Sequence, residues 1–284
     1  MKLCRFNDDR LGLVQDDNTL LDVTGALDAL PTLNWPVPLG DALVANLSLV
    51  TSEMSRLAAD APSVPMADVV LNSPVANPSK IMGAPINYQK HIDESKTDDG
   101  IVSAREISHI SDWGMFLKAN SSLVGAGEGV TLSFTDARND HEMELAVIIG
   151  KEGKNIPMAE ARGYIAGYTM GLDMTTRGKE LQSFRKSADS YSVLGPWMVT
   201  ADEIADPNKL DLKISVNGEM RQESNTDQLV YDVDKLIEYC SERYTLYPGD
   251  IIMTGTPDGV GPVVPGDTMT CELEGVGMME VNVN

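Results

Sequence analysis

Short apolar runs separated by turn residues dominate the chain after Lys80. Strand-like runs occupy residues 145–149, 164–173 and 250–256, and Gly, Pro and Asp residues separate them from their neighbours. This pattern predicts strands rather than helices. Residues 233–244 form one clear amphipathic stretch with apolar side chains at helical spacing. We therefore expect an α+β protein with an antiparallel or mixed β core and few helices.

A smaller β-rich unit precedes this core. Two apolar runs flank the turn-forming residues 7–10, and residues 42–59 carry apolar side chains at near-helical spacing, which predicts a helix. Prolines are concentrated in residues 61–80, which is typical of a linker. We predict a small N-terminal domain over residues 1–72 and a main domain over residues 73–284.

The segment of residues 92–112 is polar and has no clear period. A loop of this length inside a compact domain is usually functional or disordered. We expect it to act as a lid, with a helix over residues 103–107 when the lid closes.

The composition is that of a globular chain with a strong negative charge. Its 284 residues are 42% hydrophobic and 23% charged, with 22 Lys and Arg against 43 Asp and Glu, a net charge of −21 at pH 7. Such a protein would be repelled by nucleic acids and by anionic membrane surfaces, so we expect neither as a partner. A small anionic substrate remains compatible if cations gather in its pocket.

Cysteine usage indicates a cytoplasmic protein. Cys4, Cys240 and Cys271 are odd in number and far apart in sequence, which argues against a disulfide framework and against zinc–thiolate chemistry. The apolar runs are too short to span a bilayer, and the N-terminus lacks the apolar core of a signal peptide. We expect neither a membrane anchor nor secretion.

Three acidic residues lie at the ends of two of the apolar runs. On a strand, Glu142 and Glu144 point to the same face, about 7 Å apart, and Asp173 ends the second run. Two buried carboxylates this close require a proton or a cation between them. Oxygen ligands without a nearby cysteine or histidine pair suit Mg²⁺ or Mn²⁺. The alternatives are a solvated strand end for the glutamates and a turn cap for Asp173.

Cations gather shortly after these acids. The sequence places Arg177, Lys179, Arg185 and Lys186 within a short stretch of a chain that is poor in positive charge. Such a cluster suits a substrate carboxylate or a developing enolate. A solvated basic face is the alternative for any one of these residues.

His91 and Glu94 form a candidate acid–base pair. They are three residues apart, which is about one turn if the segment is helical, so Glu94 would hold the imidazole and raise its basicity. The alternative is an ordinary surface pair, because this spacing alone is unspecific.

Several segments, taken in order, resemble the fumarylacetoacetate hydrolase superfamily, in particular its acylpyruvate hydrolase and 2-hydroxyhepta-2,4-diene-1,7-dioate isomerase-like branch. They read GAPINYQKHIDE, FLKANSSLVG, DHEMELAVIIGK, AGYTMGLDMTTR, RKSADSYSVLGPW and PGDIIMTGTPDGVG. The resemblance covers the chain from about Lys80 onward, and the N-terminal unit is similar to that family's N-terminal domain. It implies a mixed β-roll core with the metal site at its open end, and a homodimer.

The resemblance also implies roles for individual residues. The family's metal ligands, normally for Mg²⁺ or Mn²⁺, correspond to Glu142, Glu144 and Asp173, and its water-activating dyad corresponds to His91 and Glu94. The residues implied to face the substrate are a catalytic lysine, Lys186, and a substrate-binding set, Arg177, Gln182, Tyr191 and Thr256. His141 takes a place where the family more often has an aromatic residue, and on a strand it points away from the two glutamates.

The residues and the resemblance together predict a Mg²⁺- or Mn²⁺-dependent hydrolase. It would cleave a C–C bond in a β-diketo acid of the 2,4-dioxo or acylpyruvate type, giving a 2-oxo acid and a carboxylic acid, in the catabolism of aromatic compounds or sugar acids. The His–Glu pair favours hydrolysis, because a C–C hydrolase must activate water. The alternatives are an isomerase, tautomerase or decarboxylase of unsaturated 2-oxo diacids, including oxaloacetate, and a non-catalytic metal-dependent binding protein.

Overall fold

The computed structural model describes residues 1–15, 18–96 and 109–284. Most of the predicted lid, including the helix expected over residues 103–107, lies outside the described residues. The two described ends of the lid belong to helices α3 (Gln89–Ser95) and α4 (Ile110–Trp113).

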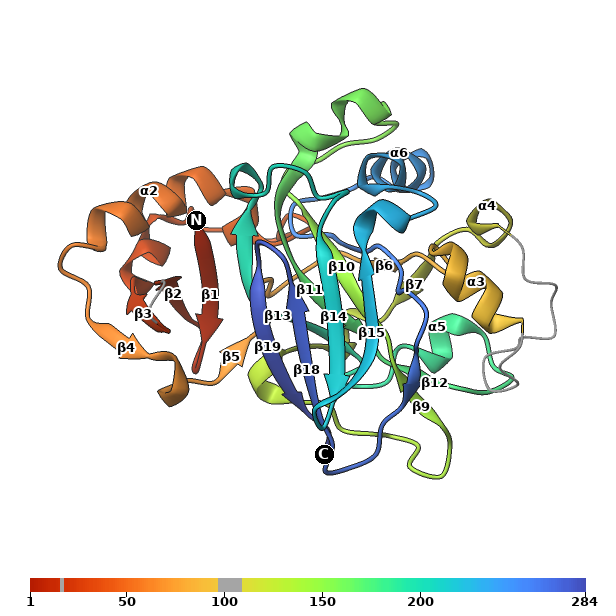
Figure 1. The fold of residues 1–284 in the computed structure, drawn as a ribbon. Coiled ribbons are helices and arrows are strands. Elements are labelled where there is room, and N and C mark those ends of the chain that lie inside the picture. Colours follow the sequence, from red (N-terminus) through yellow and green to blue (C-terminus); the bar gives the residue numbers. More distant parts are fainter. Residues whose placement is uncertain (16–17, 97–108) are drawn as a thin grey trace.

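A large mixed sheet organises the molecule (Figure 1). Its strands, in spatial order, are β4 (Ser63–Pro65), β3 (Thr19–Asp22), β2 (Arg10–Val14), β1 (Lys2–Phe6), β13 (Ser192–Thr200), β11 (Ile165–Asp173), β10 (Met143–Ile149), β16 (Ile251–Met253), β6 (Ile81–Gly83) and β7 (Phe116–Lys118). Two short strands, β5 (Leu71–Asn72) and β8 (Leu123–Gly125), pair with β1 and β13. Most neighbours are antiparallel, but β16 runs parallel to β6 and β8 runs parallel to β13. The expected α+β fold with a mixed β core is confirmed.

A second, antiparallel sheet packs on the first. Its strands, in spatial order, are β15 (Glu219–Asn225), β14 (Asp211–Val216), β18 (Thr268–Leu273) and β19 (Gly277–Asn282). Ile214 and Cys271 of this sheet share one apolar core with Leu145 and Met170 of the large sheet. A small third sheet consists of β12 (Thr175–Thr176), β9 (Asn139–His141) and β17 (Gly261–Pro262).

Strands β10 and β11 run through the middle of the apolar core. Every residue of both strands is buried. Along β10, Leu145 and Val147 belong to one apolar core, while Ala146 and Ile148 belong to a second core on the other face. A strand that is covered on both faces requires a continuous apolar sequence, which residues 145–149 supply, and the strand predicted there is confirmed.

The N-terminal strands extend the large sheet. Leu3 of β1 lies opposite Met198 of β13, and it shares an apolar core with Ile148 of β10. Helix α2 (Leu47–Leu57) contributes the buried side chains of Val50 and Met54 to the same core. The domain boundary after residue 72 stays a prediction.

The two helices predicted within the described residues are both present. The helix expected over residues 42–59 consists of α1 (Ala42–Ala45) and α2, which are separated at Asn46. The helix expected over residues 233–244 is α6 (Val233–Arg243). The Asp232 carboxylate caps α6 by accepting a hydrogen bond from the Lys235 N–H at 2.8 Å.

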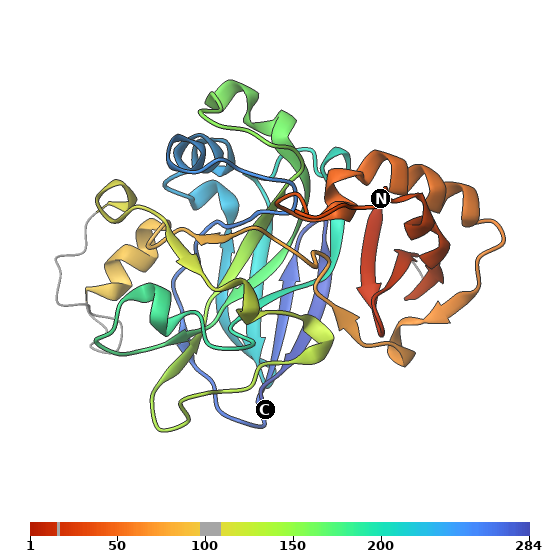
Figure 2. The same ribbon diagram turned by 180° about the vertical axis from the view of Figure 1, so that it is seen from behind.

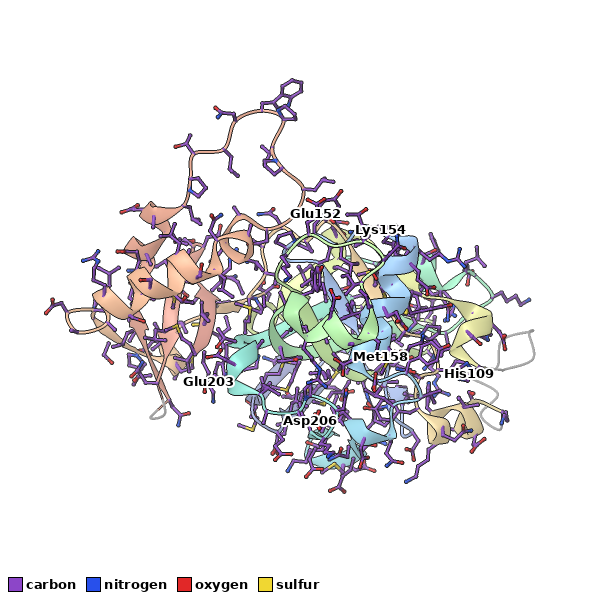
Figure 3. All side chains as sticks on the ribbon, turned by 90° about the horizontal axis from the view of Figure 1, so that it is seen from above. His109, Glu152, Lys154, Met158, Glu203 and Asp206 are labelled. Carbon is purple, nitrogen blue, oxygen red and sulfur yellow. The ribbon has the colours of Figure 1, made fainter. Side chains whose placement is uncertain are left out.

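Figures 1 and 2 both place α3, β7 and α5 (Gln182–Arg185) at the same end of the roll. Elsewhere in the molecule, the loop after β10 lies against α6 (Figure 3). Lys154 donates to the Glu242 carbonyl, and the Met158 N–H donates to the Glu238 carboxylate, both at 3.1 Å. No helix within the described ranges is long and apolar enough to cross a membrane.

Candidate metal centre and substrate pocket

Three acidic side chains meet where β10 begins and β11 ends. The two strands are antiparallel, with Met143 opposite Leu172, so the start of one lies beside the end of the other. The Asp173 N–H donates to the Glu142 carbonyl at 2.9 Å. One carboxylate oxygen from each of Glu142, Glu144 and Asp173 lies within 4.8 Å of the others, and all three residues are buried. The structure thus brings the three predicted metal ligands together, while their role as ligands stays a prediction.

The mutual repulsion of these acids acts most strongly on Glu144. Burial, followed by the negative charges of Asp173 and Glu142, raises the pKa of Glu144 well above its ordinary value. The Gly255 N–H donates to its Oε2 at 2.6 Å. A divalent cation would remove the repulsion. Because three carboxylates are the hard oxygen donors that Mg²⁺ and Mn²⁺ prefer, the residues fit the expected ion.

Two buried lysines contact the same acids. The Lys186 ammonium donates to Glu142 Oε2 at 2.6 Å and to Asp173 Oδ2 at 2.7 Å, and Lys118 pairs with the other oxygen of Asp173. Burial lowers the pKa of Lys118, whereas for Lys186 the charges of Asp173 and Glu142 outweigh burial and raise the pKa. Lys186, which we expected beside the substrate, therefore also bridges two predicted metal ligands. A carboxylate oxygen accepts more than one partner, so capacity for an ion remains.

Arg177 is fixed between two acids. Its Nε donates to Asp140 at 2.7 Å and its Nη2 donates to Glu142 Oε1 at 2.9 Å. Burial opposes the ionisation of Glu142, but Lys186 and Arg177 together lower its pKa below the ordinary value. Glu142 is therefore held ionised by its neighbours, whereas burial and the nearby acids disfavour the ionised form of Glu144.

The predicted acid–base pair lies in the wall of the same pocket. His91 Nδ1 is 2.8 Å from Glu94 Oε2 in helix α3, and the Gly259 N–H donates to the other oxygen of Glu94 at 2.9 Å. A carboxylate that accepts the Nδ1 proton leaves Nε2 as the basic nitrogen. His91 is only 5% exposed and lines the pocket with the acids, which excludes an ordinary surface pair.

A close approach of two backbone segments joins α3 to the acids. Gly255 has φ of +100°, and a Cβ at this position would lie 2.7 Å from the Cβ of Asn87. Only glycine combines this φ with so little space. Asn87 is fully buried and donates to the carbonyls of Tyr231 and Thr254, both at 2.8 Å. The contact holds the N-terminal side of α3 against the turn that donates to Glu144.

The remaining predicted residues divide between the pocket and the core. Gln182 and Thr256 line the pocket. Tyr191 is fully buried, and its hydroxyl donates to Asn139 at 2.7 Å; neither it nor His141 is part of the pocket wall that the described residues form. The proposed substrate contact of Tyr191 stays a prediction without support from this arrangement.

Sequence reasoning missed several residues of this region. Lys118 lies on the buried face of β7, where Phe116 and Lys118 point inward and Leu117 points outward. A lysine on the buried side of a strand requires an acidic partner, and this alternation was the available signal. Phe116 lies under the Lys186 ammonium, 5.1 Å from ring centre to nitrogen. Trp113 lines the pocket from α4.

Comparisons with known proteins identify the family. The model for the fumarylacetoacetate (FAA) hydrolase C-terminal family matches residues 80–284, and the chain therefore belongs to the fumarylacetoacetate hydrolase family, as the resemblance predicted. It is 52% identical over 285 aligned positions to maleylpyruvate hydrolase of Aquipseudomonas alcaligenes, covering 100% of this chain and 99% of that protein. It is 37% identical over 235 positions to mitochondrial oxaloacetate tautomerase Fahd2a of Rattus norvegicus, covering 78% of this chain and 72% of that protein.

A solved structure shares the fold over the whole chain. The crystal structure of maleylpyruvate hydrolase from Sphingobium sp. SYK-6 in complex with manganese(II) ion and pyruvate matches with a TM-score of 0.83 at 36% identity, covering 100% of this chain and 98% of that one. The predicted class, a metal-dependent enzyme of this superfamily, is confirmed. The manganese ion of this relative agrees with the expected divalent cofactor, for which the acidic triad of this chain offers oxygen ligands.

Proposed function

We propose that this protein hydrolyses a C–C bond in an acylpyruvate such as maleylpyruvate, with Mg²⁺ or Mn²⁺ as cofactor. One water is consumed, and the products are a carboxylic acid and pyruvate. The observation that carries the proposal is one pocket in which three buried carboxylates, within 4.8 Å of one another, lie beside a buried histidine that is paired with Glu94. The 52% identity to a maleylpyruvate hydrolase supports the choice of substrate.

Glu142, Glu144 and Asp173 would hold the metal ion, which when bound supplies Lewis-acid stabilisation of negative charge on the substrate oxygens. The Lys186 ammonium places a further positive charge beside the same carboxylates. The Phe116 ring lies 5.1 Å from this ammonium, at cation–π distance. Negative charge that develops on the substrate would therefore meet preorganised cations in a buried site, where electrostatic stabilisation is strongest.

His91 is the base that would activate water. Glu94 accepts the Nδ1 proton and keeps Nε2 available as the acceptor. As Nε2 takes a proton, the water oxygen bonds to the carbonyl carbon remote from the 2-oxo acid end. The C–C bond to the neighbouring methylene then breaks, its electron pair forms the enolate of pyruvate, and the proton on His91 passes to the methylene carbon.

Tautomerisation or decarboxylation of oxaloacetate is the second candidate. One observation favours it, the 37% identity to an oxaloacetate tautomerase over 78% of this chain. Neither reaction needs an activated water, so His91→Ala separates the two functions. Loss of acylpyruvate cleavage with oxaloacetate turnover retained supports hydrolysis as a distinct activity of the His–Glu pair, whereas retention of both places water activation elsewhere.

We further propose a homodimer in the cytoplasm. The uncharged segment of residues 33–39 carries exposed apolar side chains, among them Trp35, which is 92% exposed, and a second copy of the chain would cover them. The three cysteines are free and buried, in keeping with a reducing compartment. Light scattering should give the mass of a dimer, and Trp35→Ser should shift it toward the monomer; a wild-type monomer would contradict the proposal.

An assay on the purified protein tests the proposed reaction. The enol absorbance of maleylpyruvate should disappear only with Mg²⁺ or Mn²⁺ present, stop disappearing when a chelator is added, and resume when the metal is restored. Turnover that survives complete chelation would contradict the metal-dependent mechanism. Failure of the metal-loaded protein to cleave a panel of acylpyruvates would contradict the reaction itself.

A further inference from the structure

One guanidinium in the pocket wall has no acidic partner among the described residues. Arg185 ends helix α5 and lines the pocket together with Trp113 and Phe116. Its Nε donates to the Glu180 carbonyl at 2.9 Å and its Nη1 donates to the Thr176 carbonyl at 3.1 Å. Among the residues that the structure describes, no carboxylate forms an ion pair with Arg185, although the chain carries 43 acidic residues.

The other cations of the pocket region are already paired with acids. Ion pairs to carboxylates in or beside the acidic triad are made by Lys118, Arg177 and Lys186. These three lie at the end of the pocket where a 2-oxo acid would bind to the metal. Within the described part of the chain, Arg185 is therefore the pocket cation left for a second negative group.

The free N–H groups of Arg185 suit a carboxylate. A guanidinium has five N–H groups in a planar fork, and its two carbonyl contacts use one on Nε and one on Nη1. The remaining hydrogens lie on Nη1 and Nη2, the two nitrogens through which a guanidinium binds both oxygens of a carboxylate side by side. Burial and the neighbouring charge of Arg177 disfavour the charged form and lower the pKa of Arg185. A bound carboxylate would offset both effects.

Arg185 makes no hydrogen bond to the described acids at the metal end. The charges of Glu142 and Asp173 act on its pKa, but it bonds to neither of them. The wall that it shares with Trp113 and Phe116 is aromatic. A ligand with an acidic group at each end and a hydrocarbon chain between them would offer one charge to the metal end, one to Arg185, and an apolar segment to the aromatic side chains.

We propose that Arg185 is the specificity-determining residue that binds the distal carboxylate of a dicarboxylic acylpyruvate. The inference rests on the proposed function and narrows its substrate class to acylpyruvates that carry a second carboxylate at the end remote from the 2-oxo acid. An acylpyruvate that ends in a methyl group leaves the Arg185 guanidinium without a partner.

Two substrates with the same reacting atoms test this proposal on the metal-loaded enzyme: maleylpyruvate, which has the distal carboxylate, and acetylpyruvate, which lacks it. Arg185→Gln should lower kcat/KM for maleylpyruvate by roughly 30- to 100-fold, mainly through KM, and change that for acetylpyruvate by less than about threefold. Arg185→Lys keeps the positive charge but loses the planar guanidinium. Its kcat/KM for maleylpyruvate should lie between those of wild type and Arg185→Gln.

Lys209→Gln is the matched control, because it removes one positive charge from an exposed side chain that does not line the pocket. This control should leave kcat/KM unchanged for both substrates. An equal loss on both substrates in Arg185→Gln would place the residue at the common 2-oxo acid end and overturn the proposal. Unchanged kinetics on maleylpyruvate would overturn it as well.

A binding measurement separates this proposal from the proposed function. Calorimetry on Mg²⁺-loaded protein compares 2-oxoheptanedioate with 2-oxoheptanoate, two ligands of equal length that differ in the distal carboxylate and do not undergo the cleavage. Wild type should bind the diacid at least about tenfold more tightly, and Arg185→Gln should lose that preference. If no acylpyruvate is cleaved, a preference that depends on Arg185 still supports the inference; equal affinity of wild type for both ligands contradicts it.

Discussion

The acidic triad and the rim of the pocket stand on different kinds of structure. The acids lie at the ends of β10 and β11, whose residues are all buried, whereas His91 and Arg185 lie on the short helices α3 and α5. A strand hydrogen-bonded on both sides fixes its side chains through the sheet, while helices this short depend on tertiary contacts. The pocket thus joins a rigid ionic centre to a rim whose side chains act on the rest of the substrate.

The largest loss of activity should come from a substitution in the acidic triad. Glu142→Gln keeps the shape of the side chain but leaves Lys186 and Arg177 facing a neutral amide. We expect loss of Mn²⁺ binding by calorimetry and a fall in kcat/KM of at least about 10³-fold. Glu152→Gln, an exposed glutamate in the loop after β10 (Figure 3), is the matched control. Unchanged turnover in Glu142→Gln would remove the triad from the reaction.

A substitution of His91 on the rim should impair catalysis without impairing metal binding. His91→Ala is expected to lower kcat for acylpyruvate cleavage by about 10²- to 10⁴-fold and to leave Mn²⁺ affinity within about threefold, because His91 is not among the proposed ligands. His109→Ala alters an exposed histidine that packs edge-on against Tyr231, and should change neither quantity. Loss of metal binding in His91→Ala would show that the rim and the acidic triad do not act separately.

The close approach of Gly255 to Asn87 connects the two regions, and adding one methyl group there should lower the stability of the protein. Gly255→Ala places a Cβ 2.7 Å from Asn87 at a φ of +100°, and should lower the free energy of unfolding by about 2–3 kcal/mol. Gly266 has nearly the same φ, +98°, with nothing within 4 Å of a Cβ, so Gly266→Ala should cost only about 1 kcal/mol. Equal losses in denaturant titrations would show that the crowding at Gly255 is unimportant.

The smallest effect should come from the aromatic wall. Phe116→Leu removes the ring that covers the Lys186 ammonium and should lower kcat/KM by about three- to tenfold, in line with the strength of a cation–π contact. Leu117→Val, one residue along on the exposed side of β7, should leave the steady-state kinetics unchanged. A Phe116→Leu enzyme with wild-type rates would show that this contact does not stabilise the reacting charge.

Much of the acidic triad and of the strands that carry it could be predicted from the sequence. A continuous apolar run predicts that β10 is covered on both faces, and period-two alternation puts Glu142 and Glu144 on one side of it. Asp173 is the acid that ends the second apolar run, and the resemblance to a known family implies the same three ligands. These predictions succeed because strand geometry and burial are local properties of the sequence.

The rim could not be predicted in the same way. Helices α4 and α5 are four residues long, too short to show a helical period. Lys118 and Asp173 pair across 55 positions of sequence, a contact that only the fold creates. Likewise, the run of cations after Asp173 does not reveal that Arg177 is paired with acids, whereas Arg185 contacts only carbonyls in the described part of the chain.

Anomalous diffraction from crystals soaked in Mn²⁺ tests the central claim most directly. We predict one strong manganese peak within coordination distance of carboxylate oxygens from Glu142, Glu144 and Asp173. Saturation with Mn²⁺ that leaves no peak there, with the Lys186 ammonium occupying the space between the three acids, would contradict the account.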